Sequence, residues 1–259
     1  MASEGTSAIR EAARAIAARG NCVALTGAGI SVESGIPAFR GAQGMWDRFD
    51  PMEYATIGAF RRDPGKVWRM LAEMLEILER AAPNPAHRGI AELESRGLLR
   101  SVITQNVDGL HQAAGSRGVI EFHGSARELV CLSCPNRYPT REKVLEGIPP
   151  RCGCGTILKP DIVFFGEQIP RAAMEMAESE AESAAVLLVV GTSAEVSPAC
   201  DIPLLARRQG AFIIEVNPEE TVLTRSLSDT HLRESAGTAL PKILAEIRKS
   251  PAPPSSAPS

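Results

Sequence analysis

The stretch GAGISVESGIPAFRG, residues 27–41, follows the short apolar run NCVALT at residues 21–26. A Gly-x-Gly turn directly after a buried strand is the setting of a loop that binds the phosphates of a dinucleotide. Here the third glycine of the usual fingerprint is missing, and GIPAFRG follows instead. The stretch therefore indicates a nucleotide site, but not the usual loop of a hydride-transfer enzyme.

Composition limits the classes of protein to consider. The chain has 259 residues, 44% of them hydrophobic, with a formal net charge of -3 and no long basic run. This length suits one large α/β unit or two modest lobes with a buried core. The charge argues against direct nucleic-acid binding, and no apolar run approaches the roughly 20 residues of a membrane span. We expect a soluble, cytoplasmic protein, without a signal peptide, that does not bind a membrane.

Helical and strand patterns alternate along the chain. Apolar residues at helical spacing predict helices over 7–19, 64–80, 85–95 and 171–184. Short, largely apolar runs predict strands over 21–26, 101–104, 118–122, 185–190 and 211–216. Strands that are apolar throughout are covered on both faces. The alternation predicts the α/β class, with a doubly wound parallel sheet.

Polar signatures follow three of these strands: TGAG, TQNVD and GTSAEVSP. Ligands of such sheets bind beyond the carboxyl ends of the strands, so we expect the three loops to face one crevice. The sequence EVNPE adds a candidate at a fourth strand, where either Glu215 or Asn217 could hold a ribose hydroxyl. Together these loops predict a nucleotide site.

Four cysteines form the pattern C-x2-C, x17, C-x-C, with the members Cys131, Cys134, Cys152 and Cys154. Two close pairs separated by a short loop suit one tetrahedral zinc ion. Four thiolates leave no open coordination position, so the ion is expected to be structural. Cys22 and Cys200 stand apart and are read as small buried hydrophobic residues.

Two histidines follow strands. An imidazole that titrates near neutrality is a natural general base beside a bound cofactor. His123, in EFHG, is the better candidate, whereas His111, at the start of an expected helix in TQNVDGLH, is read as structural.

With these motifs the chain resembles the sirtuins, NAD-dependent protein-lysine deacylases, of the bacterial and archaeal type. The resemblance runs from about Ile9 to Leu244, and its motifs occur in the order of the family: GAGISVESGIPAFRG, TQNVDGLHQAAG, EFHGS, the cysteine pattern, LKPDIVFFGE, GTSAEVSPA and VNPEET. It implies acyl transfer from lysine to the ADP-ribose part of NAD, with release of nicotinamide. NAD would be consumed, and one zinc ion would be structural.

The resemblance also implies a Rossmann-type large domain and a smaller lobe. We assign 1–44, 81–123 and 161–249 to the large NAD-binding domain, 45–80 to a helical module and 124–160 to a zinc module. Residues 250–259, rich in Pro and Ser, are expected to be a disordered tail. The partner would be an acyl-lysine protein or peptide, and we expect a monomer.

Site residues are carried over by position. His123 would be the general base, and Asn106 and Asp108 would organise ribose, water and the nicotinamide carboxamide. NAD would be contacted by Gly27, Ala28, Gly29, Ser31, Glu33, Pro37, Phe39, Arg40, Trp46, Gln105, Asn106, Asp108, Gly191, Thr192, Ser193, Asn217, Pro218, Glu219 and Ala236. The acyl-lysine segment would lie against Leu71, Met74, Val163, Phe164, Phe165, Gly166, Glu167 and Val196, with Glu195–Pro198 beside it.

Two positions depart from the family pattern. Ala38 stands where Asp or Thr is frequent, which removes a polar side chain near the cofactor. Leu71 and Met74 stand where desuccinylating members have a Tyr-x-x-Arg pair. Without that arginine an acyl carboxylate would be buried unpaired, so we expect removal of acetyl or longer apolar acyl groups. The alternative is that both residues only belong to the core stripe of their helix.

Other functions remain to be weighed against deacylation. A dehydrogenase is disfavoured, because no strand ending in an acidic ribose anchor follows about 20 residues after the first turn. A mono-ADP-ribosyltransferase would use the same site. A zinc-containing NAD sensor is disfavoured by the joint presence of Asn106, Asp108 and His123.

Overall fold

Two sheets form the framework of the chain in the computed structural model, which describes residues 2–38 and 44–249. The larger sheet has six strands in the order β3-β2-β1-β7-β8-β9, and all neighbours are parallel. Its strands are β1 (Cys22–Thr26), β2 (Leu99–Thr104), β3 (Val119–Glu121), β7 (Val186–Val190), β8 (Phe212–Val216) and β9 (Thr230–Leu232). The α/β, doubly wound class is therefore confirmed.

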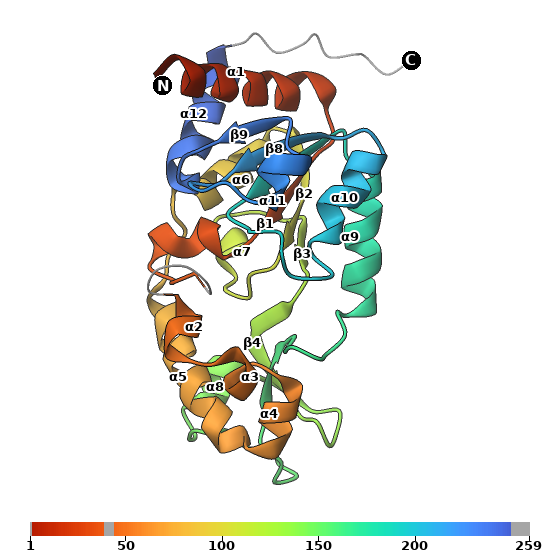
Figure 1. Cartoon of the computed structure of the whole chain (residues 1–259). Helices are drawn as coiled ribbons and strands as arrows, with labels where there is room; N and C mark the ends of the chain where they lie inside the picture. The colour runs from red at the N-terminus through yellow and green to blue at the C-terminus, as the bar shows by residue number, and fades with distance from the viewer. Residues whose placement is uncertain (1, 39–43, 250–259) are drawn as a thin grey trace.

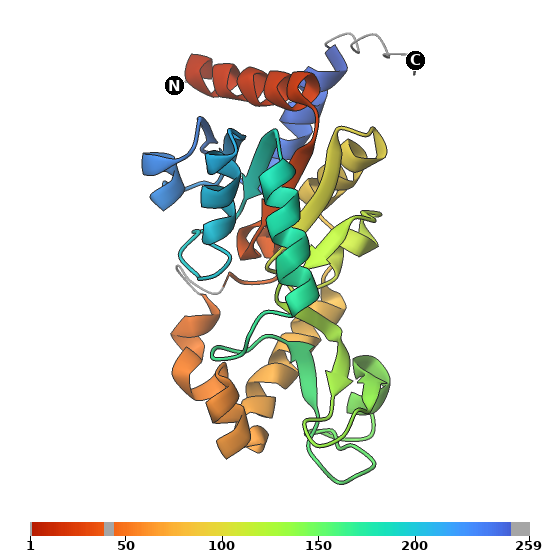
Figure 2. The same cartoon turned by 90° about the vertical axis from the view of Figure 1, so that its right-hand side faces the viewer.

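Helices cover both faces of this sheet (Figures 1 and 2). One face packs against α1 (Ala2–Arg19), α6 (Pro85–Ser95) and α12 (Ala236–Lys249), and the other against α9 (Arg171–Ser183) and α10 (Asp201–Arg208). Successive side chains of a strand point to opposite faces. Accordingly Val186, Leu188 and Val190 enter the first core, while Leu187 and Val189 enter the second. This explains why the β7 sequence is apolar throughout.

The topology fixes where a ligand can bind. From β1 the chain builds outward to β2 and β3 on one side, and later to β8 and β9 beyond β7 on the other. The order of strands thus reverses between β1 and β7, where the loops after the two strands diverge and leave a crevice. Thr26, the last residue of β1, pairs with Thr104 of β2 and Val190 of β7. All three strands end at the same level, so their loops meet at one edge.

Three short helical segments lie between the strands: η1 (Ala28–Ser34, a 3-10 helix), α7 (Leu110–Ala113) and α11 (Val222–Ser226).

A smaller lobe lies below the carboxyl edge of the sheet in Figure 1. It contains α2 (Met45–Arg48), α3 (Pro51–Tyr54), α4 (Ile57–Arg62), α5 (Pro64–Arg80) and α8 (Thr140–Val144). A three-stranded antiparallel sheet in the order β5-β4-β6 completes it: β4 (Gly124–Val130), β5 (Arg137–Pro139) and β6 (Lys159–Ile162). The helix α5 begins where the Asp63 side chain accepts the Lys66 N–H and Pro64 occupies the first turn.

Trp68 ties the helices of this lobe to its sheet. The indole is fully buried, and its Nε1–H donates to the carbonyl of Leu158, at 2.8 Å, in the segment that leads into β6. Leu129 of β4 and Leu71 of α5 pack in the same core. The helical and cysteine-containing segments therefore share one core, although more than 40 residues separate them in sequence.

The structure differs from the sequence-based expectations in several details. The first helix begins at Ala2 rather than residue 7, and the small antiparallel sheet was not predicted. The strand β6 extends across the expected boundary at 160/161, because it pairs with β4 of the small lobe. Phe39, Arg40 and the expected tail at 250–259 lie outside the described residues. Within residues 2–38 and 44–249, no helix is long and apolar enough to cross a membrane.

Replacing Trp68 tests the link between the two parts of the small lobe. Trp68→Phe leaves the buried Leu158 carbonyl without its donor, so we expect the free energy of unfolding to fall by about 1–3 kcal/mol. Urea denaturation followed by the fluorescence of the remaining Trp46 measures this change. Leu204→Ala, at a side chain that is 42% exposed, should change stability by less than about 0.5 kcal/mol. An unchanged Trp68→Phe midpoint would contradict the assigned contact.

Candidate active site

A cleft of about 680 Å³ runs along the carboxyl edge of the parallel sheet and is walled on its other side by the small lobe. The loops after β1, β2 and β7 all contribute to it, at Gly27–Gly29, Gln105–Val107 and Gly191–Pro198. The three polar strand ends that the sequence singled out therefore face one crevice.

Three glycines allow the β1 and β7 loops to touch. The Gly29 N–H donates to the carbonyl of Gly191 at 2.8 Å, and the Gly27 N–H donates to that of Val190 at 3.0 Å. A Cβ on Gly29 would lie 2.7 Å from the Gly191 Cα, and a Cβ on Gly191 would lie 2.4 Å from the Ile30 nitrogen. Gly191 also has φ of +63°, which favours glycine. The amides of Gly27 and Gly29 thus bond to backbone carbonyls within the protein.

His123 lies on the cleft wall with one ring nitrogen fixed. Its Nδ1 is 3.0 Å from the carbonyl oxygen of Gln105. A carbonyl only accepts, so Nδ1 carries the proton and Nε2 has the free lone pair. Burial lowers the pKa of His123, and the bond to Gln105 opposes that shift only in part. The imidazole is therefore neutral at neutral pH, as a general base must be.

Asn106 and Asp108 meet at the buried hydroxyl of Ser31. The Asn106 amide donates to the Gly27 carbonyl and to Ser31 Oγ, both at 3.1 Å. Ser31 Oγ in turn donates to Asp108 Oδ2 at 2.7 Å. Ser31, from the loop after β1, thus links the Asp108 carboxylate to the Asn106 amide, the two groups that the sequence assigned to catalysis.

His87 supports this group from behind, and sequence reasoning missed it. Its Nε2 is 3.4 Å from Ser31 Oγ, and its Nδ1 accepts the N–H of Asn84. Burial lowers the pKa of His87, while the nearby Asp108 charge opposes the shift. Asn84 caps α6 and donates to the Ile30 carbonyl. The Asn-Pro helix start with a histidine at its third position was the signal in the sequence.

His111 has the structural role that was expected. It is buried, its Nε2 lies 2.9 Å from Thr26 Oγ1, and burial lowers its pKa to about 3. It packs edge-on against the ring of His87, at 5.0 Å between centroids. An imidazole that remains neutral at all ordinary pH values supports the β1 loop rather than exchanging protons.

Glu215 and Asn217, the two candidates at the carboxyl end of β8, have different surroundings. The Glu215 carboxylate is buried and accepts the hydroxyls of Thr221, Thr224 and Ser228. Asn217 lies on the cleft and donates to the Thr192 carbonyl at 3.3 Å. Of the two, only Asn217 lines the cleft, whereas the Glu215 carboxylate is occupied by the hydroxyls of its own loop.

The small-lobe wall is mostly apolar. It contains Met70 and Met74 of α5 and Phe164 and Phe165 after β6. Leu71, expected at the substrate, is instead fully buried in the lobe core and does not line the cleft. The helix turns Met70 toward the cleft in its place, because Met70 and Met74 are four residues apart and share a face.

The remaining predicted residues fall into two connected spaces. The main cleft is lined by Gly27, Ala28, Gly29, Glu33, Trp46, Gln105, Asn106, Gly191, Thr192, Ser193, Asn217, Pro218, Glu219, Ala236, Val163, Gly166, Glu167 and Val196. A smaller cavity is lined by Ser31, Pro37 and Asp108, and it shares Ala28, Met74, Asn106 and Val107 with the cleft. Ala38 also lines the main cleft, and its carbonyl accepts the Met45 N–H.

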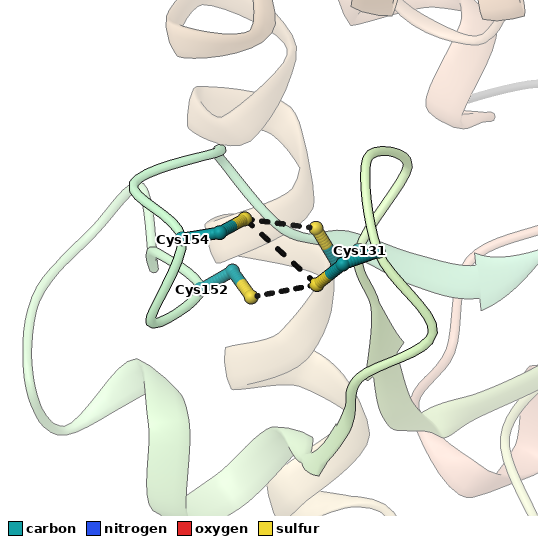
Figure 3. Close-up of side chains that lie close together, drawn as sticks. Cys131, Cys152 and Cys154 are labelled. Carbon is teal, nitrogen blue, oxygen red and sulfur yellow. Dashed lines mark hydrogen bonds between the residues drawn. The ribbon is translucent and has the colours of Figure 1, made fainter.

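Four thiols meet in the small lobe, as the cysteine pattern predicts (Figure 3). Cys131 and Cys134 come from the turn after β4, and Cys152 and Cys154 from the loop before β6. Their sulfurs lie 3.6 Å apart for Cys131–Cys154, 3.5 Å for Cys134–Cys152 and 3.8 Å for Cys134–Cys154. Zn–S bonds of about 2.3 Å in a tetrahedron place sulfurs about 3.8 Å apart. The four side chains fit one zinc ion.

Comparison with known proteins gives consistent matches over most of the chain. The profile of the Sir2 family matches residues 27–198. NAD-dependent protein deacylase 2 of Pyrobaculum aerophilum is 47% identical over 235 residues, which are 90% of this chain and 94% of that protein.

Solved structures agree with the sequence match. A Sir2 homologue in complex with NAD has a TM-score of 0.84 at 45% identity and covers 92% of this chain and 93% of its own. A Sir2 protein bound to a myristoylated histone peptide has a TM-score of 0.80 at 39% identity, with coverage of 94% and 97%. The likeness to these structures covers more than 90% of this chain.

The thiol cluster predicts the metal content of the protein. We expect one zinc per chain by elemental analysis, and loss of that zinc in Cys154→Ser, since zinc prefers thiolate ligands. Stripping the ion with a chelator should lower the Tm, because binding energy is part of the folding energy of such modules. Cys200→Ser, outside the cluster, should retain full zinc. A purified wild-type protein that folds fully without zinc would refute the assignment.

Proposed function

This chain belongs to the Sir2 family, and from that premise we infer that it is an NAD-dependent protein-lysine deacylase. It transfers the acyl group of a modified lysine to the ADP-ribose part of NAD and releases nicotinamide. The observation that carries this assignment is His123, which lies in the cleft with Nδ1–H held by the Gln105 carbonyl and Nε2 free to accept a proton. A sensor or scaffold has no need of an imidazole fixed in this tautomer.

We propose that NAD occupies the sheet side of the cleft. Thr192 and Asn217 present a hydroxyl and an amide there, and Gln105 is fixed by donation to Thr192 Oγ1 at 3.0 Å. Polar groups at the carboxyl ends of β2, β7 and β8 suit the two riboses and the diphosphate. When bound, NAD supplies the electrophilic ribose carbon that nicotinamide leaves.

His123 and Asn106 would act in the cleft, and Asp108 would act in the smaller cavity that shares Asn106 with it. His123 Nε2 would take the proton of a ribose hydroxyl, and the Gln105 carbonyl would stabilise the imidazolium that results. Asn106 and Asp108, joined through Ser31, would orient the carboxamide end of the cofactor. Both reactants would be held in one site, which supplies the orientation for acyl transfer.

The acyl group would lie against the small-lobe wall. The charged side chains on the described part of the cleft are Glu33, Glu167, Glu195, Glu219 and Glu220, with no lysine or arginine among them. Met70, Met74, Phe164 and Phe165 provide apolar surface instead. We propose that acetyl and longer apolar acyl groups are accepted, and that a succinyl carboxylate is rejected because it would be buried unpaired.

We also propose a cytoplasmic location. The zinc site requires Cys131, Cys134, Cys152 and Cys154 in the reduced form, and reducing compartments maintain thiols in that form.

The central experiment is incubation with NAD and an acetyl-lysine peptide, followed by mass spectrometry. We expect nicotinamide, O-acetyl-ADP-ribose and a deacetylated peptide from the wild type. His123→Ala should lose about 10²–10⁴-fold in rate, the usual contribution of a general base, while Leu204→Ala at the surface retains the rate. A peptide or protein that gains the mass of ADP-ribose would instead identify a mono-ADP-ribosyltransferase.

The pH profile tests the state of His123. Its pKa lies below the ordinary value of 6.5, so the neutral base predominates above that pH. We expect kcat/KM to be flat around neutrality and to fall only as the pH decreases below 6.5. A profile that already falls between pH 8 and 7 would mean that the catalytic base is another group.

Acyl preference is measured with matched acetyl, myristoyl and succinyl peptides. We expect kcat/KM for the succinyl peptide to be at least about 10-fold below that for acetyl, equivalent to about 1.4 kcal/mol of unpaired burial. Met74→Arg supplies a cation at the cleft wall and should raise the succinyl/acetyl ratio. Met176→Arg, at a residue of α9 that is 54% exposed, is the control. Preferred succinyl turnover by the wild type would overturn the proposal.

A further inference from the structure

Lys159 is a buried charged residue that the proposed reaction does not use. It is the first residue of β6, and only 3% of it is exposed. Its ammonium donates to the carbonyls of Pro160, at 3.1 Å, and Ile162, at 2.6 Å, and lies 3.0 Å from Glu167 Oε2. An ammonium has three donors, so every one has a partner. A lysine is rarely buried in this way without a specific pairing role.

Glu167 closes a tight turn on the same side. Its N–H donates to the Phe164 carbonyl at 2.9 Å, while its carboxylate accepts the Phe164 N–H at 2.8 Å. Gly166 supplies the positive φ, +86°, that this turn requires. The Lys159 ammonium also lies 4.7 Å from the centre of the Phe164 ring. One ion pair, with a buried lysine and a partly exposed glutamate, therefore fixes both ends of the turn 164–167.

The turn joins three parts of the cleft. Just before it, the Val163 N–H donates to the backbone carbonyl of His123 at 2.9 Å. Within it, Phe165 bonds through its backbone to Ala55 and Ile57 of the helical module, at 2.9 and 3.0 Å. The residues from Val163 to Glu167 all line the cleft. A shift of this turn would displace the apolar wall of the cleft, while the loops after β7 and β8 would keep their positions.

We propose that the Lys159–Glu167 pair is a positioning device that preforms the acyl-lysine side of the cleft. Glu167 was expected to contact the substrate, but its carboxylate is bonded to Lys159 and to the Phe164 N–H. Its role is to hold the wall on which the acyl-lysine segment lies. The inference rests on the proposed deacylase function, and it concerns peptide binding alone, since the NAD side is built from other loops.

Steady-state kinetics of Lys159→Met and Glu167→Ala, with NAD and peptide varied separately, test the proposal. We expect KM for the acetyl peptide to rise about 10-fold in each, with KM for NAD and the calorimetric affinity for ADP-ribose within twofold of wild type. Because both residues act through one turn, the double variant should rise no further than the larger single effect. Lys159→Arg, which retains a cation for Glu167, should recover part of the loss.

Controls separate this role from general stability and from the proposed function. Lys249→Met breaks a surface pair with Glu246 and should leave both KM values unchanged. Tm and zinc content show which variants fold. If Lys159→Met fails to fold, Glu167→Ala decides the test, because the Glu167 side chain is partly exposed and its loss is tolerated more easily. Unchanged peptide KM in a folded variant, or equal changes toward NAD and peptide, would overturn the inference. Failure of the wild type to deacylate would instead overturn the proposed function.

Discussion

The active site depends on how closely the loops after β1 and β7 approach each other. The two strands are neighbours at the point where the order of the sheet reverses, so their loops must diverge in opposite directions from one small area. Gly29 and Gly191 touch there through backbone atoms alone, and a methyl group on either would overlap the other loop. This contact sets the positions of Asn217, through Thr192, and of Ser31, through the helical turn that begins at Ala28.

The missing third glycine of the first loop has a structural reason. In a hydride-transfer fold that glycine lets an α-helix pack closely on the strand. Here a 3-10 helix follows instead, Val32 is 48% exposed, and no close packing is needed at its position. The tighter helix buries Ser31, whose hydroxyl reaches Asp108 and the Asn106 amide. The departure from the fingerprint thus joins the first loop to Asn106 and Asp108 after β2.

Local patterns in the sequence were sufficient for much of this architecture. An apolar β7 with two buried faces indicates a parallel sheet, and four cysteines at metal-ligand spacing indicate their own cluster. The roles of residues that depend on partners distant in the chain could not be predicted from the sequence. The role of His87 depends on its contact with Ser31, and that of Lys159 on Glu167, which closes a turn eight residues later. The choice of Met70 over Leu71 depends on the rotation of α5 about its axis. Periodicity gives the apolar stripe of a helix, but not which edge of it faces a cleft.

His123 stands where two differently built halves of the cleft meet. On the sheet side, backbone contacts between glycines and strand ends define the cleft. The opposite wall belongs to the small lobe and is held by the Lys159–Glu167 pair together with backbone hydrogen bonds of Val163 and Phe165. His123 bonds to both, since its ring donates to Gln105 at the end of β2 and its carbonyl accepts Val163 from the segment after β6. The position of His123 therefore depends on the relative orientation of the two lobes. The position of His123 is thus a property of the interface between the lobes rather than of either lobe alone.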